Sequence, residues 1–212
     1  HTMRLDGPAH VRERVGGITF LVSPISFFQT NALVAATLVD LVVEQIGAPP
    51  RHVADLYAGS GLFALPLAAR GHLVKAIEES AQAVEDGEAN VRLNRLSKRV
   101  RFIRSRVEDA LDRFKSRDVD AAILDPPRAG CPIRVLDRVF GDIAPETVIY
   151  VSCNPEALAA ELPSIVDAGY DVRRVQPVDM FPHTTHLETV VTLGRQQSKP
   201  SKRDHRATNA HT

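Results

Sequence analysis

Short apolar segments alternate with helical ones along most of this chain, and this alternation restricts the possible folds more than any other feature. Four of the segments read as strands that are buried on both faces, at 52–56, 73–77, 120–124 and 147–151. Strands of this kind form parallel sheets that helices cover on each side. The pattern therefore predicts an α/β fold built on a doubly wound, mostly parallel sheet.

The other segments complete the expected fold. Gly47 and the prolines after it end one helix, and Ser80 is a capping residue that starts another. Two segments near the C-terminal end, 170–177 and 187–193, can pair as closing strands, so that the sheet gains an antiparallel member. The remaining expected strands are 18–22 and 100–103, and the expected helices are 31–46, 62–69, 80–96, 107–114, 133–140 and 156–168.

A length of 212 residues suits one domain. We expect residues 1–17 to be an N-terminal leader, in part a cloning remnant because His1 and Thr2 precede Met3. Residues 18–195 should form the folded domain that carries the motifs described below. Residues 196–212 are basic and almost without apolar side chains, so they are expected to be a disordered tail.

The net charge is zero, but the charges are unevenly spread. From Arg195 onward five basic residues and one acidic residue give +4, so residues 1–194 carry −4 and do not form a generally basic nucleic-acid-binding domain. The stretch from Arg92 to Arg106 is an exception, with seven basic residues and no acidic one. It fits a solvated helix end and strand edge as well as it fits a patch that contacts phosphates.

The composition also indicates where the chain works. The two cysteines, Cys131 and Cys153, are too few for a disulfide framework, which favours a reducing, cytoplasmic setting. No apolar run reaches the ~18–20 residues of a membrane helix, and the N-terminus does not read as a signal peptide. We therefore expect a cytoplasmic protein without membrane contact. We expect a monomer, because nothing in the sequence indicates an obligate dimer.

Glycine and acidic residues follow the first two buried strands, at the edge where α/β folds bind ligands. Segment 55–61, DLYAGSG, is a strand-to-helix turn in which Gly59 and Gly61 let the backbone approach a ligand closely. Glu78 ends the next strand, at the spacing expected of an acid that binds ribose hydroxyls. Segment 59–64 also fits the dinucleotide fingerprint. These residues predict an adenosine cofactor and leave open whether it is NAD or S-adenosylmethionine.

Two further strand ends carry more specific chemistry. In the segment 125–128, DPPR, the prolines hold the carboxylate of Asp125 rigidly at the sheet edge, as a methyltransferase acting on a planar nitrogen or a base requires. The alternative is a rigid loop with a capping aspartate. In the segment 152–155, SCNP, Cys153 lies just before a helix, whose N-terminus stabilises a thiolate. We interpret Cys153 as a nucleophile.

The last polar cluster lies where the final strand begins. His183, His186 and Glu188 could suggest a metal site. The other strand ends supply no natural further ligands, however, and a thiol nucleophile needs no metal, so we expect none. We interpret Glu188 as a general base near Cys153, the alternative being a surface carboxylate at a strand end.

Together these segments resemble the RNA 5-methyluridine methyltransferase family, class I enzymes that methylate C5 of uracil in tRNA and large-subunit rRNA. The resemblance covers residues 18–193 and implies the class I methyltransferase fold, which is Rossmann-like, with S-adenosylmethionine as cofactor and RNA as partner. It rests on five motifs in the family's order: 27–31 (FFQTN), 55–61 (DLYAGSG), 125–130 (DPPRAG), 150–155 (YVSCNP) and 180–188 (MFPHTTHLE).

The resemblance also implies a role for individual residues. Cys153 is the nucleophile that adds to C6 of a uridine in rRNA or tRNA, and Glu188 is the base that removes the C5 proton. Asp125 lies at the junction of cofactor and substrate with Arg128 beside it, and we expect one or the other to steady the uracil edge or its developing charge. The residues expected to bind the cofactor are Gln29, Asp55, Tyr57, Gly59, Gly61, Leu62, Glu78 and Asp125.

The chain departs from the family in one respect. Family members usually carry an N-terminal RNA-binding domain and a central domain, and some hold an iron–sulfur cluster on four cysteines. Neither fits here, so we expect an isolated catalytic domain or a reduced relative. The alternatives are a class I methyltransferase acting on cytosine C5 or on a nitrogen, and an RNA- or cofactor-binding domain that is inactive without further domains. A nicotinamide dehydrogenase is the remaining alternative.

Overall fold

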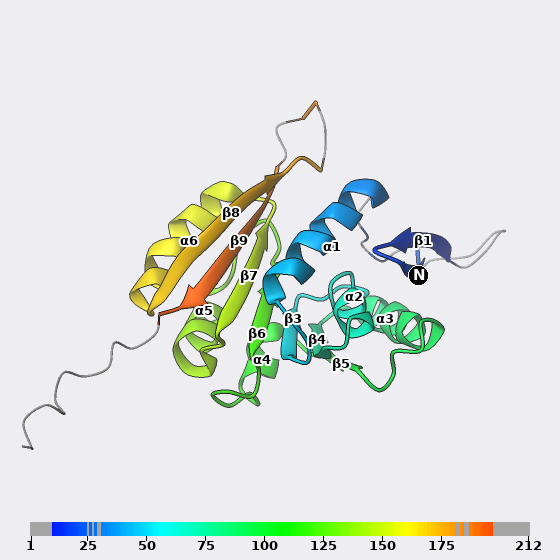
Figure 1. Cartoon of the computed structure of the whole chain (residues 1–212), viewed down its shortest axis with the longest axis horizontal. Helices are drawn as coiled ribbons and strands as arrows, with labels where there is room; N and C mark the ends of the chain where they lie inside the picture. Colours follow the sequence, from blue (N-terminus) through cyan, green and yellow to red (C-terminus); the bar gives the residue numbers. More distant parts are fainter. Residues whose placement is uncertain are drawn as a thin grey trace, which may run out of the picture.

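The computed structural model describes residues 10–24, 26, 28, 31–180, 183–184 and 187–196. These residues form one seven-stranded sheet with helices on both faces, and a separate two-stranded hairpin (Figure 1). The strand order in the sheet is β5-β4-β3-β6-β7-β9-β8. Its strands are β3 (His52–Leu56), β4 (Leu73–Glu78), β5 (Val100–Arg104), β6 (Ala121–Leu124), β7 (Thr147–Ser152), β8 (Tyr170–Val178) and β9 (Glu188–Arg195).

The strand directions confirm the expected fold class. Strands β5, β4, β3, β6 and β7 are parallel neighbours. Strand β9 runs antiparallel both to β7 and to β8, so the two closing segments do pair. The helices are α1 (Ala32–Ile46), α2 (Ala64–Ala69), α3 (Ala81–Leu93), α4 (Val107–Leu111), α5 (Ile133–Leu136) and α6 (Pro155–Asp167), with a π-helix, η1 (Asp137–Ile143), after α5.

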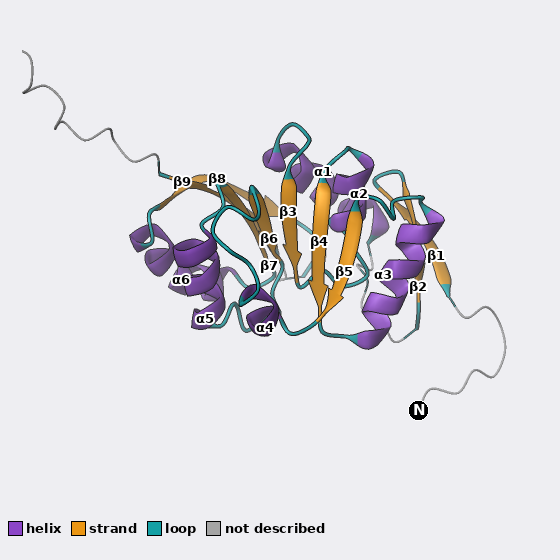
Figure 2. Cartoon of the chain, turned by 90° about the horizontal axis from the view of Figure 1, so that it is seen from below, coloured by secondary structure: helices purple, strands orange, loops and turns teal. Residues whose placement is uncertain are grey.

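The helices cover the sheet on both faces (Figure 2). Helices α1, α2 and α3 share one apolar core with Ile123 of β6, while α4, α5 and α6 share a second core with the next residue, Leu124. Because successive strand residues point to opposite faces, burial on both sides requires continuous apolar strands, as the sequence has them. Within the described part of the chain, no helix is both long enough and apolar enough to cross a membrane.

The separate hairpin consists of β1 (Val11–Val15) and β2 (Ile18–Val22), of which only β2 is predicted by the sequence. The outer edge of β2 pairs with side chains of α3. Asn94 accepts from the Thr19 amide at 3.1 Å and donates to the Thr19 carbonyl at 2.8 Å. The Asn90 side chain likewise accepts from the Leu21 amide at 2.7 Å and donates to the Leu21 carbonyl at 3.2 Å. Residues four apart on a helix thus match residues two apart on a strand.

Asp86, one helical turn before Asn90, extends this pairing to the segment after β2. Its carboxylate accepts from the Ser23 amide at 2.8 Å, from the Ser23 hydroxyl at 2.6 Å and from the Ser26 hydroxyl at 2.7 Å. The ring of Phe28 packs on Phe20 of β2, with 5.2 Å between the ring centroids. The three α3 side chains therefore anchor the backbone that leads to Phe28.

Several element ends differ from the prediction for local reasons. Helix α6 begins one residue early, at Pro155, because the Asn154 side chain caps it and proline suits the first helical position. Helix α4 ends at Leu111, and the chain to Phe114 continues as a turn. The helix expected over 133–140 changes into the π-helix at Asp137 and ends at Ala144, whose φ of 49° is left-handed.

Candidate active site

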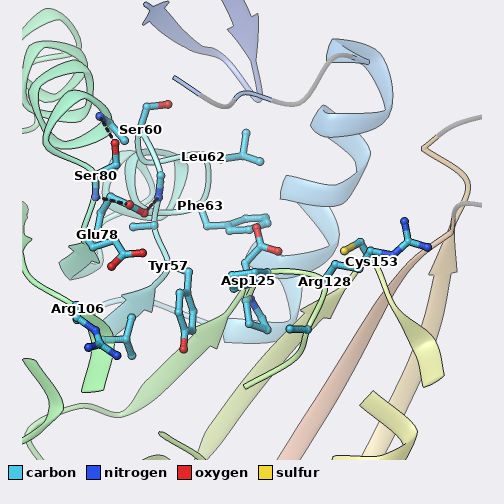
Figure 3. A pocket seen from close by; sticks show the side chains of 18 of the residues that line it. Tyr57, Ser60, Leu62, Phe63, Glu78, Ser80, Arg106, Asp125, Arg128 and Cys153 are labelled. Atoms are coloured by element: carbon cyan, nitrogen blue, oxygen red, sulfur yellow. Dashed lines mark hydrogen bonds between the residues drawn. The ribbon is translucent and has the colours of Figure 1, made fainter. Parts of the chain in front are cut away.

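A cavity of about 1020 Å³ opens at the carboxyl ends of the parallel strands. This is about the upper end of the range for small-molecule sites, roughly 300–1,000 Å³. Figure 3 shows Glu78 and Ser80 at one side, Arg128 and Cys153 at the other, and Asp125 between them. The predicted residues that line the cavity are Tyr57, Gly59, Leu62, Glu78, Asp125, Arg128, Cys153 and Glu188.

Glu78, at the end of β4, is held by two backbone amides. Its carboxylate accepts from the Gly59 amide at 2.9 Å and from the Ser80 amide at 2.8 Å. Each oxygen keeps a second lone pair, so the carboxylate can still accept from a ligand in the cavity. The Ser80 side chain caps α3 through the Ala83 amide at 3.4 Å, which fixes the loop after β4.

The turn after β3 is bent to bring backbone to the cavity. Gly59 has a φ of 53°, and no atom lies within 4 Å of the position that a Cβ would take. Tyr57 has a φ of 63°, which is unusual for a residue with a side chain. Such strain persists where the surroundings over-determine it, commonly at ligand sites.

Two predicted cofactor residues, Asp55 and Gly61, are not among the residues that line the cavity. A Cβ on Gly61 would overlap the side chain of Leu65, so this glycine allows close packing of the turn on α2. Asp55 is fully buried, and neither carboxylate oxygen has a hydrogen-bond partner within the described part of the chain. Burial raises the pKa of Asp55 to about 7; the nearby Ala64 amide lowers it, without cancelling the rise, and the charge of Glu78 adds to it.

The loop that carries Cys153 is tied to the loop that carries Arg128. The Ser152 hydroxyl accepts from the Asn154 amide at 3.1 Å and donates to the Asn154 carbonyl at 2.9 Å. The Asn154 side chain caps α6 and donates to the Arg128 carbonyl at 3.0 Å. Asn154 thus fixes the start of α6 and joins the two loops, which also holds the neighbouring Cys153 in place.

Strand register sets Glu188 beside Cys153. The antiparallel ladder between β7 and β9 pairs Ser152 with Thr189. The ladder ends at that pair, so Cys153 directly follows the last paired residue of β7 and Glu188 directly precedes the last paired residue of β9. Both side chains line the cavity, and Glu188 is buried, with 6% of its surface exposed. The pattern of the closing strands therefore brings a thiol and a carboxylate together.

The expectation that the helix N-terminus favours the Cys153 thiolate is not met. Burial raises the pKa of Cys153, as do the charges of Glu188 and Asp125, while the Cys153 amide and Arg128 lower it without cancelling the rise. Burial also raises the pKa of Glu188. The pKa of Asp125 is well above its ordinary value because of burial and of the charges of Glu188 and Asp55.

Acidic groups outnumber basic ones around the cavity. Arg106, one of the two lining arginines, lies 3.4 Å from Glu108. Those carboxyl groups that are ionised favour a cationic ligand and disfavour a diphosphate. The lining acids are Glu78, Glu79, Glu108, Asp125 and Glu188, and the lining arginines are Arg106 and Arg128.

The second cysteine has a different environment. Cys131 is buried, and burial raises its pKa to about 12, so its thiol is unreactive at neutral pH. Its amide donates to Glu161 at 2.8 Å, and the Tyr150 hydroxyl donates to the other oxygen of Glu161 at 2.7 Å. Glu161 therefore fastens the end of the Asp125 loop to β7 and α6.

Sequence reasoning missed some lining residues. Arg106 and Glu108 follow β5 and could have been found by extending the strand-end argument to that strand. Phe63 also lines the cavity, whereas the sequence predicts it only as part of the helix over 62–69. Gln29 and His186 lie outside the described residues. Among the residues that are described, no group of three or more His, Cys, Asp or Glu side chains could hold a metal ion.

The sheet order, its antiparallel strand β9 and the cavity at the carboxyl edge define the class I methyltransferase fold. Comparison with known proteins gives the family. Residues 12–196 match the model of the family described as tRNA (uracil-5-)-methyltransferase, and the chain belongs to that family.

Individual relatives agree with this assignment. An RNA methyltransferase of uncharacterised function from Caldanaerobacter subterraneus subsp. tengcongensis is 38% identical over 89% of the chain and 42% of its own length. One from Chlorobaculum tepidum is 39% identical over 91% of the chain and 41% of its own length. A solved structure of Pyrococcus abyssi tRNA (uracil-54, C5)-methyltransferase with S-adenosyl-L-homocysteine matches with a TM-score of 0.78 and 35% identity, covering 88% of this chain and 45% of that one. The chain thus spans about two fifths of the length of the curated relatives.

Proposed function

We propose that this chain is the catalytic domain of an S-adenosylmethionine-dependent methyltransferase that methylates C5 of a uridine in RNA. The observation that carries the proposal is that Cys153 and Glu188, at the paired ends of β7 and β9, both line one ligand-sized cavity and interact electrostatically. A nucleophile and a base on the same side of one substrate ring are what substitution at a pyrimidine carbon needs. Membership of the family supports the uracil target.

The residues around the cavity fit S-adenosylmethionine better than NAD. The excess of carboxylates suits the sulfonium and ammonium charges of the former and repels the diphosphate of the latter. Glu78 would hold the ribose hydroxyls, and the Gly59 turn, Tyr57 and Leu62 would lie along the nucleoside. Gln29 is proposed to bind the cofactor by resemblance alone, and Asp55 and Gly61 to support the turn. The cofactor supplies the methyl group.

The protein's own part in the reaction is covalent and acid–base chemistry. The Cys153 thiolate forms a bond from sulfur to C6 of the uracil, and the electron pair of the C5–C6 double bond moves toward C5 and O4. C5 then becomes nucleophilic enough to be methylated. Glu188 removes the proton from C5, the double bond re-forms, and the bond from sulfur to C6 breaks to return the thiolate. Asp125 or Arg128 would steady the uracil edge or the charge on O4.

The charges around Cys153 assign a further part to two residues. Arg128 lowers the pKa of the thiol and so favours the reactive thiolate. Burial raises the pKa of Glu188, which makes its carboxylate a stronger base once it is ionised. A target base within folded RNA has to leave its stack to reach these groups.

Calorimetric titration of the purified chain tests the cofactor. We expect S-adenosylhomocysteine to bind with micromolar affinity, NAD not to bind, and Glu78→Gln to weaken binding at least tenfold. The matched control is Glu85→Gln, an exposed residue of α3 that does not line the cavity. Binding of NAD alone would revive the dehydrogenase alternative, and binding of neither ligand would overturn the proposal for this chain.

Methylation of a uridine-containing RNA tests the target. Release of tritium from [5-³H]uridine is expected with the wild-type chain and with Cys131→Ser, and not with Cys153→Ser, which should still bind S-adenosylhomocysteine. Methyl transfer without tritium release would indicate cytosine C5 or a nitrogen as the target. Equal activity of all three proteins would contradict the assigned nucleophile.

A further inference from the structure

A second hollow, at the opposite edge of the sheet from the catalytic cavity, is lined by basic side chains. It has a volume of about 210 Å³ and lies at the amino ends of β3, β4 and β5. We call it the basal hollow. Its polar lining consists of His52, Lys75, Ser97, Lys98, Arg99 and Arg101, and none of the residues that line it is acidic.

Two of these cations are direct neighbours in the sheet. The parallel register of β4 and β5 pairs Lys75 with Arg101, so both side chains stand on the same face. Like charges at such positions repel each other and cost stability. Lys75 is placed over the ring of Phe114, with 4.8 Å from its Nζ to the ring centroid, and an aromatic face does not neutralise the charge.

The neighbouring contacts leave these charges without a counter-ion. Arg99 donates to the Gly71 carbonyl at 2.8 Å, which is a neutral partner. Lys98 and Arg101 are exposed and form no ion pair with any residue that the structure describes. Asp120, next to the rim, accepts from the His52 amide at 2.8 Å and lies 3.6 Å from the His52 ring, so it is already engaged.

The basal hollow belongs to a larger basic surface. Strand β5 is the outermost strand of the sheet, with α3 beside it (Figure 2). Arg95 precedes this strand and Arg104 ends it, and both are exposed and free of ion pairs within the described chain. The surface therefore extends from the amino end of β5, at the hollow, toward its carboxyl end, near the catalytic cavity.

We propose that the basal hollow and the exposed edge of β5 bind phosphates of the RNA backbone that flank the target uridine. A repelling pair of cations is stabilised by a bound anion, and basic residues spread along an exposed edge strand suit a chain of phosphates. Strand β4 has six residues, which at ~3.3 Å each separate the two edges by ~20 Å. RNA that presents one base at the catalytic edge can cover that distance with a few flanking nucleotides. The inference rests on the proposed function.

The test is RNA binding, which requires neither cofactor nor catalysis. The double variant Lys98→Glu/Arg101→Glu is compared with the wild-type chain and with Arg173→Glu/Arg174→Glu, an equal change of charge on the exposed strand β8 at the other side of the sheet. The probe is a fluorescent uridine-containing RNA hairpin, measured by anisotropy over a range of salt concentrations. Calorimetry with S-adenosylhomocysteine and thermal unfolding check that each variant keeps its fold and cofactor site.

We expect the Lys98→Glu/Arg101→Glu variant to lose at least tenfold in RNA affinity at low salt. The magnitude of the negative slope of log affinity against log salt should fall by roughly 1.4–1.8, as for two lost phosphate contacts. The control variant should lose less than threefold. Equal losses in both variants, no loss in either, or no RNA binding by the wild-type chain would overturn the inference. It would also be overturned if inorganic phosphate bound in the hollow while the RNA slope stayed unchanged, because the hollow would then be a site for free anions only. If the wild-type chain did not bind S-adenosylhomocysteine, while Lys98→Glu/Arg101→Glu alone lost RNA affinity, the proposed function would be refuted and this inference would stand.

Discussion

Replacing Asp86 by alanine should loosen the segment that leads from β2 to the cavity. Asp86 is almost completely buried, with 1% of its surface exposed, although its carboxylate carries a charge. It accepts hydrogen bonds from the amide and hydroxyl of Ser23 and from the hydroxyl of Ser26. Phe28, two residues after Ser26, lines the cavity. One side chain therefore connects the stability of the hairpin with the shape of the cofactor site.

The expected magnitude follows from these contacts. Gln82 also donates to this carboxylate, at 3.1 Å. A hydrogen bond to a charged group contributes roughly 1.5–3 kcal/mol, and the four bonds to one carboxylate are not additive. The serine hydroxyls can turn to water in the variant, whereas the Ser23 amide loses a buried partner. We expect a loss of about 3 kcal/mol in the free energy of unfolding, or about 6–12 °C in the melting temperature for a chain of this size. The affinity for S-adenosylhomocysteine should fall roughly tenfold, which corresponds to ~1.4 kcal/mol.

The loss should depend on pH in a defined direction. Burial raises the pKa of Asp86, but hydrogen bonds from Ser23, Ser26 and Gln82 outweigh it and hold the pKa below its ordinary value. A carboxyl whose pKa is lowered by folding stabilises the native state above its unfolded pKa, about 3.9. That contribution disappears as the pH falls through the lowered native pKa. The difference in stability between the wild-type chain and Asp86→Ala should therefore narrow in acid.

Thermal unfolding and calorimetry at neutral and acid pH measure these effects. The matched control is Glu85→Ala, which removes the neighbouring carboxylate from the exposed side of the same helix. Its melting temperature should stay within about 2 °C of wild type, since surface changes stay within about 0.5 kcal/mol. The reasoning is refuted if Asp86→Ala melts like Glu85→Ala, or if it is destabilised by a constant amount at every pH.

Two further predictions concern the nucleophile and the packing of α3. The rate at which iodoacetamide alkylates Cys153 rises with pH, and the pH of the half-maximal rate reports the pKa of the thiol. This midpoint should rise in Arg128→Ala and fall in Glu188→Gln, because Arg128 lowers the thiol pKa and Glu188 raises it. Shifts of the same sign would contradict the charge assignment. Gly87→Ala should lose about 1–3 kcal/mol in urea unfolding, since a Cβ there would overlap the Phe102 ring. Gly141→Ala, with open space around its Cβ, should be neutral, and equal stability of the two variants would contradict this packing argument.

The sheet could be predicted from sequence because it depends on local pattern. The apolar segments at β3, β4, β6 and β7 must be buried on both faces, which leaves few folds other than a covered parallel sheet. Strand β1 escaped prediction since its sequence, VRERV, is mostly exposed and is stabilised through β2. Asn90 and Asn94 read as ordinary helical residues, and only the tertiary structure shows that they pair with a strand edge.

The site could be predicted as a set of residues but not as an electrostatic environment. The strand-end rule gathered Glu78, Asp125 and Cys153 correctly at one cavity, because parallel strands end at a common edge. The pKa of Cys153 could not be inferred in this way. It depends on burial and on Glu188, which is 35 residues away in sequence (188 − 153) and is brought near by the register of β7 and β9. The backbone amide at the helix start does lower this pKa, but burial and the charges of Glu188 and Asp125 outweigh it.

The most direct test of the central claim is to trap the bond between the protein and the target base. A uridine-containing RNA with fluorine in place of the C5 hydrogen offers Glu188 no proton to remove, so the bond from sulfur to C6 persists after methylation. With S-adenosylmethionine present, mass spectrometry should find an RNA adduct on the peptide that contains Cys153, in the wild-type chain and in Cys131→Ser, and none in Cys153→Ser. Methylated uridine without an adduct, an adduct that survives Cys153→Ser, or no reaction of the wild-type chain would contradict the account.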